Sequence, residues 1–116
     1  MSEHPHPPSL IITVDEHQTY AVVHVTGKLV AGVTEQLHRP VAALFPTHKR
    51  IILDLCHLTH MDSMGIGALL RLYVSGKAHH CTIECRNLGE RIRELMIMTN
   101  LLPVFTAVGE HGMRMP

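Results

Sequence analysis

The chain of 116 residues has no excess of charge of either sign, because ten Lys and Arg balance ten Asp and Glu. Proteins that bind nucleic acid hold the phosphate backbone mainly through concentrated basic side chains. No run of Lys and Arg occurs in this sequence. We therefore expect no nucleic-acid partner.

Long hydrophobic runs are also absent. No apolar stretch approaches the roughly 20 residues that a helix needs to cross a bilayer. The first eight residues lack the basic and apolar regions of a signal peptide. These absences predict a cytoplasmic protein with no membrane partner, and the length suits one domain.

Cysteine is scarce, with three residues in the chain. Cys81 and Cys85 lie four residues apart on a predicted strand, about 13 Å apart at about 3.3 Å per residue. A disulfide needs Cα atoms about 5.5–6 Å apart, so these two cannot pair in that strand. Cys56 could meet one of them, but three reduced, buried cysteines are the simpler expectation.

Histidine, in contrast, is abundant, with eleven residues. His57 with His60, and the run His79-His80-Cys81, could suggest a metal site. No Cys-x-x-Cys or His-Glu-x-x-His spacing accompanies them, so we expect neither a metal nor a cofactor, and we place most histidines in solvated loops.

Hydrophobic periodicity predicts alternating strands and helices. Pro40 falls inside the first predicted helix and should kink it or delay its start. Asn87, with Glu90 three residues later, predicts an N-cap for the third helix, and Asn100 predicts its left-handed end. The predicted strands are Leu10–Val14, Gln18–Thr26, Ile51–Leu55, one containing Cys81, Ile83 and Cys85, and Val104–Val108; the helices are Val33–Phe45, one from Ser63 to Ser75-Gly76, and one through Ile92, Leu95, Met96 and Thr99.

This order of elements predicts an α/β domain with a mixed central β-sheet and helices packed mainly on one face. The first two strands should form an antiparallel hairpin. We expect the domain to span residues 9–109, with flexible tails at 1–8 and 110–116.

The segment Asp62-Ser63-Met64-Gly65 is the most informative motif. It follows the apolar run that ends at Leu55 and the connection from Cys56 to Met61, and it opens a predicted helix. A serine on the first helical turn lies where backbone N–H groups are unpaired and the helix dipole is positive. A phosphoryl group on Ser63 would be tolerated there within its own chain.

Together, the ending Ile51-Ile52-Leu53-Asp54-Leu55 and the motif at Asp62-Ser63-Met64-Gly65 resemble the STAS domain of bacterial anti-sigma factor antagonists. Gly27-Lys28-Leu29 resembles a turn of that family, in which Val30 replaces the usual acid. The resemblance covers nearly the whole chain, from these segments to a closing segment at residues 98–105. It implies a STAS-like single domain.

The resemblance also implies a function. In that family the serine after the aspartate is phosphorylated by a partner that is both serine kinase and anti-sigma factor, and Ser63 occupies the matching position. The expected activity is a partner switch, in which the unphosphorylated chain binds this kinase and the phosphorylated chain releases it. A PP2C-type serine phosphatase would reset the switch, and a homodimer is compatible with it. The expected partner-binding residues are Leu29, Val30, Asp62, Ser63, Met64, Gly65 and Gly67.

Other interpretations of these residues remain open. Asp-Ser commonly precedes a helix because both residues cap N-termini, and Gly65 and Gly67 could merely relieve crowding. A nucleophilic Ser63 is not expected, because no Gly-x-Ser-x-Gly elbow occurs, so we predict no enzyme activity. An alternative function is a STAS scaffold or regulatory subunit of a larger assembly, stressosome-like or transporter-associated, without phosphorylation.

Met64 and Met96 have different expected roles. Met64 flanks the serine, where a flexible thioether suits a protein interface. Met96 and Met98 are expected to fill the core.

Overall fold

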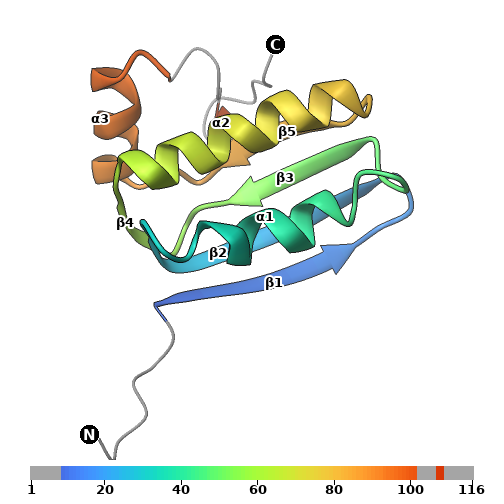
Figure 1. Ribbon diagram of the computed structural model, residues 1–116, viewed down its shortest axis with the longest axis horizontal. Coiled ribbons are helices and arrows are strands. Elements are labelled where there is room, and N and C mark those ends of the chain that lie inside the picture. Colours follow the sequence, from blue (N-terminus) through green and yellow to red (C-terminus); the bar gives the residue numbers. More distant parts are fainter. Residues whose placement is uncertain (1–8, 102–106, 109–116) are drawn as a thin grey trace, which may run out of the picture.

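The computed structural model describes residues 9–101 and 107–108, and these form a mixed β-sheet with helices (Figure 1). The strands are β1 (Leu10–Glu16), β2 (Tyr20–Leu29), β3 (Arg50–Asp54), β4 (Leu58–Met61), β5 (Thr82–Arg86) and β6 (Ala107–Val108). The helices are α1 (Thr34–Ala42), α2 (Ser63–Ala78) and α3 (Glu90–Met98).

The sheet combines antiparallel and parallel pairing. β1 and β2 form the predicted antiparallel hairpin, and β2, β3, β5 and β6 follow in parallel. The short strand β4 pairs in parallel with the end of β2, beyond the part of β2 that pairs with β3. The predicted α/β fold with a mixed sheet is confirmed.

One face of the sheet carries the core. Strand residues alternate between faces, so Val23, Leu53 and Cys85 point toward the helices, while His24, Asp54 and Arg86 form a row on the other face. Figure 1 shows α1 and α2 crossing the same side of the sheet. The helix residues in the core include Leu37, Val41, Leu69, Leu72, Ile92 and Met96.

The strand β4 corrects the sequence-based prediction, which placed a connection between Cys56 and Met61. Two of its four residues, Thr59 and His60, are exposed, so the segment lacks the apolar run of a buried strand. It forms because the end of β2 offers free backbone groups to a neighbouring strand.

Two glycines lie inside elements that they were expected to end. β2 continues through Gly27, with a register shift at Gly27/Lys28 where it passes from β3 toward β4. Gly27 has a φ of 102°, and an added Cβ would lie 2.3 Å from the carbonyl oxygen of Ser9. α2 passes through Gly76 to Ala78, because Gly76 lets the helix pack against the backbone of Cys81.

The other two helices also differ from prediction. α1 begins at Thr34, so Pro40 does not delay its start, but the helix ends at Ala42 and gives way to i→i−3 turns at Leu44 and Phe45. α3 is capped by Gly89 without a side-chain bond, so the predicted Asn87 cap is wrong. Asn100 has a φ of 59°, as predicted for a left-handed terminator.

Several side chains lie elsewhere than expected. Cys81 and Cys85 are buried and free, as predicted, but Cys56 is exposed. His48 is buried and His24 half-buried, so these two are not solvated loop histidines. The proposed tails at 1–8 and 110–116, and residues 104–106 of the last predicted strand, lie outside the described residues.

Candidate functional site

Asp62 separates β4 from α2 and caps the helix. Its backbone is extended, and its Oδ1 accepts a hydrogen bond from the N–H of Gly65 at 2.9 Å. This bond satisfies one of the N–H groups that a helix leaves unpaired at its start. Ser63 is therefore the first residue of α2, as predicted.

The second carboxylate oxygen of Asp62 ties the site to another segment. Oδ2 accepts a hydrogen bond from the N–H of Ala31 at 3.0 Å, between β2 and α1. The N–H groups of Ala31 and, next, Gly65 hold the pKa of Asp62 below its usual range, because they stabilise the ionised form. A negative charge is thus fixed beside Ser63 at neutral pH.

Ser63, Met64 and Gly67 form an exposed surface on the first two turns of α2. Met64 is 57% exposed, which suits its predicted role at an interface. A hollow of about 190 Å³ lies beside Ser63, between the starts of α1 and α2. Its lining residues are Thr34, Ser63, Met64, Gly67, Ala68 and Arg71.

Leu29 and Gly65 lie beneath this surface. Leu29 is 0% exposed, and Gly65 is buried where an added Cβ would lie 2.1 Å from the carbonyl oxygen of Leu29. In this structure the two residues let the first turn of α2 pack closely on the end of β2, and their contact with a partner stays a prediction. Gly67, in contrast, has open space around an added Cβ.

An ion pair lies two turns further along α2. Arg71 Nη1 donates to Glu35 Oε2 of α1 at 2.6 Å, and both side chains are more than half exposed. This hydrogen bond is the main cause that lowers the pKa of Glu35. His38 of α1 is close to the same arginine, and its pKa is lowered first by burial and then by the charge of Arg71.

Val30 lies at a second depression, a groove of about 440 Å³ between β4 and α3. Met98, 80% exposed, lines the same groove, so the expectation that Met98 fills the core is wrong, whereas Met96 is buried at 1%. The groove also reaches Asp62, and its lining is mostly apolar. Val30 therefore extends an apolar surface next to the motif.

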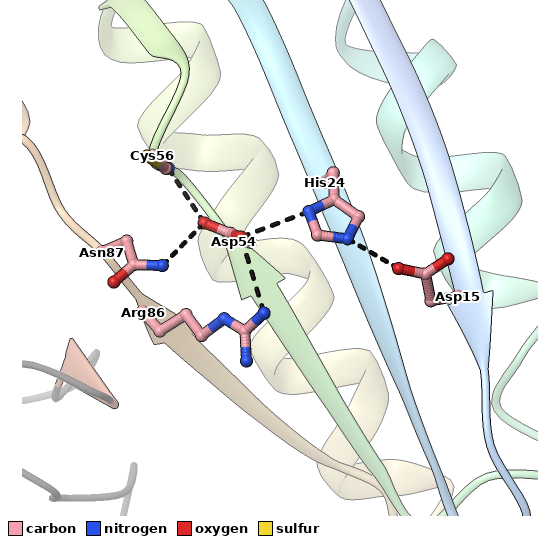
Figure 2. A network of polar contacts seen from close by, with 6 residues as sticks. All are labelled: Asp15, His24, Asp54, Cys56, Arg86 and Asn87. Atoms are coloured by element: carbon pink, nitrogen blue, oxygen red, sulfur yellow. Dashed lines mark hydrogen bonds and ion pairs between the residues drawn. The ribbon is translucent and has the colours of Figure 1, made fainter.

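A second aspartate, Asp54, organises the same edge of the sheet from the opposite face (Figure 2). It ends β3, and its Oδ1 accepts from the N–H of Cys56 at 3.1 Å and from Nδ2 of Asn87 at 3.2 Å. Its Oδ2 lies 3.2 Å from Nδ1 of His24 and 3.6 Å from Nη2 of Arg86. The carboxylate thus joins the loops that follow β3 and β5.

His24 extends this cluster to the edge strand. Its Nε2 lies 2.9 Å from Asp15 Oδ2 on β1, so the ring stands between two carboxylates (Figure 2). A neutral imidazole donates from one nitrogen only. The ring can therefore donate to both carboxylates at the same time only when it is protonated. Burial opposes ionisation of Asp54, but the bonds from Cys56 and Asn87 and the nearby charges of Arg86 and His24 keep its pKa lowered.

Sequence reasoning missed Ala31, Arg71 and the cluster around Asp54. A backbone donor such as Ala31 leaves no sequence signal. The cluster does leave one, because His24 interrupts a strand of valines at a position that faces away from the core.

No group of three or more His, Cys, Asp and Glu side chains in residues 9–101 and 107–108 is arranged to hold a metal ion. In the same part of the chain, no helix combines the length and apolar composition that crossing a membrane requires.

Known proteins share this sequence pattern and fold. Residues 12–111 match the family model of the STAS domain. An anti-sigma factor antagonist from Mycobacterium paratuberculosis superimposes with a TM-score of 0.73 and 23% identity, over 90% of this chain and 89% of that one.

Two further proteins extend this comparison. The anti-sigma factor antagonist SpoIIAA in its unphosphorylated form gives a TM-score of 0.71 and 21% identity, over 87% and 90% of the two chains. The murine solute carrier 26 family member A9, an anion transporter, superimposes with a TM-score of 0.66 and 21% identity. The match covers 76% of this chain and 15% of the transporter. At these identities the superpositions establish a shared fold.

Proposed function

The chain belongs to the STAS domain family, and on that premise we propose that it is an anti-sigma factor antagonist controlled by phosphorylation of Ser63. The unphosphorylated protein binds an anti-sigma factor that is also a serine kinase. Phosphorylation releases this partner, and a PP2C-type serine phosphatase restores the binding form. The similarity in fold to antagonists that match over nearly their whole length supports this class of function.

The observation that carries the proposal is the exposed Ser63 on the first turn of α2, beside a carboxylate that the backbone holds in place. A kinase must reach the hydroxyl without unfolding the helix, and the exposure of Ser63, Met64 and Gly67 allows that approach. Because both oxygens of Asp62 accept from backbone N–H groups, the carboxylate stays in place when the serine is modified.

The proposed modification is a phosphoryl transfer from ATP bound by the partner. The oxygen of Ser63 attacks the γ-phosphorus, the bond from this phosphorus to the β–γ bridging oxygen breaks, and ADP leaves. The proton of the hydroxyl passes to a base of the kinase. In the reverse half of the cycle, water attacks the phosphorus and the phosphatase releases inorganic phosphate.

Electrostatics explains why the same group is tolerated within the chain and rejected at the interface. The phosphoryl group adds about −1.5 to −2 charge, which the positive end of the α2 dipole stabilises. A docked partner, however, would cover this charge together with that of Asp62 and exclude water from both. Desolvation and like-charge repulsion then weaken the complex.

A phosphorylation assay with site-directed variants tests the site. Wild type, Ser63→Ala and Ser75→Ala are incubated with candidate anti-sigma factor kinases and ATP, and incorporated phosphate is located by mass spectrometry. Ser75 lies on the same helix and is half-buried, so its variant is the matched control. We expect one phosphate in wild type and Ser75→Ala and none in Ser63→Ala; equal incorporation in all three would refute the assignment.

Binding to the same kinase tests the switch. Protein with phosphoserine at position 63 should bind the kinase at least about 100-fold more weakly than the unmodified protein, which corresponds to roughly 3 kcal/mol. Isothermal titration calorimetry measures both affinities. Equal affinities would show that phosphorylation does not control this complex.

A second candidate function is a STAS scaffold or regulatory subunit that works without phosphorylation, in a stressosome-like or transporter-associated assembly. The similar fold of the domain in an anion transporter and the apolar Val30 beside the groove favour it. Light scattering after size-exclusion chromatography separates the candidates, because a scaffold should form a large assembly while a switch protein should be a monomer or homodimer.

A further inference from the structure

We propose that Arg71 binds the phosphoryl group of phosphorylated Ser63, and that it leaves Glu35 of α1 to do so. This inference rests on the proposed function, because it concerns the modified form of the same serine. It gives the phosphoryl group a partner within the chain and gives phosphorylation an effect on the contact between α1 and α2.

The spacing along α2 allows the contact. Ser63, Gly67 and Arg71 follow one another at intervals of four residues, and their Cα atoms span about 12 Å along the axis at about 1.5 Å per residue. Helical side chains lean toward the N-terminus, so the long arginine extends toward Ser63 and covers more of this distance than the short phosphoserine side chain. The two groups approach each other over Gly67.

Gly67 leaves the intervening space empty. An added Cβ at Gly67 would have no heavy atom within 4 Å, whereas one at Gly65 would collide with the end of β2. Ser63 and Arg71 line the same hollow of about 190 Å³ across this glycine. A hollow of this volume has room for a phosphoryl group.

The present partner of Arg71 is easily exchanged. Arg71 and Glu35 are 57% and 53% exposed, and exposed ion pairs are weak because water competes for both groups. A phosphoryl group offers more charge and three acceptor oxygens, and a guanidinium binds two of these oxygens at once. The arginine therefore faces a more highly charged partner and makes more hydrogen bonds when it turns from the carboxylate to the phosphate.

The exchange alters the surface around the motif as well as Ser63 itself. The Arg71–Glu35 contact joins the exposed sides of α1 and α2, so its loss removes a link between them. Glu35 is left without its positive partner near the proposed docking surface. Phosphorylation would then present two changes to the kinase, a phosphate that Arg71 neutralises only in part and the released carboxylate of Glu35.

The test uses protein with phosphoserine installed at position 63 during translation, so it needs no kinase. Phosphorus-31 NMR follows the second ionisation of the phosphate in an otherwise unchanged chain and in Arg71→Gln and Arg39→Gln. Arg39 also lies on an exposed position near Glu35 but does not line the hollow, so it is the matched control. Asp62, Glu35 and His38 are present in all three proteins. Loss of Arg71 favours a cationic His38, which would lower the phosphate pKa and so oppose the expected rise in Arg71→Gln.

We expect the phosphate pKa to be lower by about half a unit or more with Arg71 than in Arg71→Gln, because a nearby cation favours the dianion. Arg39→Gln should titrate like the unchanged protein. Equal phosphate pKa values with and without Arg71 would overturn the inference.

The carboxyl group of Glu35 supplies the reciprocal readout. In unphosphorylated protein Arg71 keeps its pKa below the ordinary value of 4.5. Carbon-13 NMR should show this pKa rising toward 4.5 in the phosphoserine protein, and no such rise in Arg71→Gln. An unchanged Glu35 pKa on phosphorylation would also count against the exchange, whereas failure of every kinase to modify Ser63 would refute the proposed function alone.

Discussion

Two aspartates at the same edge of the sheet, Asp54 and Asp62, use their carboxylates differently. Asp54 is bound by the side chains of His24, Arg86 and Asn87 as well as by the backbone N–H of Cys56, and its side chain is only 11% exposed. The two oxygens of Asp62 accept from backbone N–H groups, at Gly65 and Ala31.

The difference separates support from function. A carboxylate that binds side chains from neighbouring strands holds those strands together. Substitution or modification of any of these side chains therefore disturbs the whole network. A carboxylate that binds backbone leaves the adjacent side chains free, so Ser63 can be modified while the cap remains. Both aspartates have a lowered pKa, which shows that a shifted pKa alone does not distinguish the two roles.

The largest expected effect comes from the packing beneath Asp62. Gly65→Ala places a Cβ 2.1 Å from the carbonyl oxygen of Leu29, so the helix start must move away from β2. We expect a loss of about 3 kcal/mol in the free energy of unfolding, measured by urea denaturation.

Gly67→Ala is the matched control, two residues along the same helix. Its added methyl group meets open space, and alanine favours a helix over glycine by up to about 1 kcal/mol. We expect unchanged or slightly higher stability. If Gly65→Ala were as stable as Gly67→Ala, the close packing of the first turn would not support the site.

A smaller loss is expected at the other aspartate. Asp54→Asn removes the charge that faces His24 and Arg86. Its remaining oxygen can still accept from Cys56 and Asn87, but its amide nitrogen cannot accept from His24 or Arg86. The free energy of unfolding at neutral pH should fall by about 1–2 kcal/mol in denaturant titrations. Asp15→Asn, at a side chain 65% exposed, should cost less than about 0.5 kcal/mol.

The pH dependence of this loss follows from the direction of the pKa shift. The pKa of Asp54 in the folded protein lies below its ordinary 3.8, so its stabilisation is complete above 3.8. The stabilisation disappears as the pH falls through the folded value. The stability difference between wild type and Asp54→Asn should therefore shrink below about pH 3.8; a constant difference would exclude ionisation as its cause.

The smallest expected change in stability is at Asp62. Asp62→Asn keeps an oxygen that can accept from Gly65, but its amide nitrogen cannot accept from Ala31. Amide hydrogen exchange should accelerate about three- to tenfold at Ala31 and remain nearly unchanged at Gly65. Equal acceleration at both positions would mean that the whole cap is lost and that the two oxygens do not have separate roles.

The elements that sequence reasoning located well are those with a local physical cause. The hydrophobic run of β3 and the alternation in β2 predict strands because each residue's face follows from the pleat. Asp62-Ser63 predicts a helix start because the cap acts within four residues. Asn100 ends α3 for the same local reason.

The elements that were predicted wrongly depend on contacts that form only in the folded chain. The sequence predicts that Gly27 ends a strand, but Gly27 is a glycine because the backbone of Ser9, remote in sequence, comes too close for a side chain. It also predicts that Gly76 ends a helix, but an added Cβ there would meet Cys81 and also Ile83 of β5, which packs against α2. Asn87 read as a helix cap, yet its side chain turns to Asp54, which lies 33 residues away. β4 has too few apolar residues to indicate a strand and depends on its pairing with β2.

By itself, the sequence determined the α/β class, the start of α2 and the position of Ser63 on its first turn, because periodicity and capping act over a few residues. Only the tertiary structure decided which residues around Ser63 lie beneath the surface and which lie on it. It buried Leu29 and Gly65, left Met64 and Gly67 exposed, and placed Arg71 beside the same hollow as the serine. These outcomes depend on how closely α2 approaches β2 and α1, and distances between segments remote in the chain are set by packing.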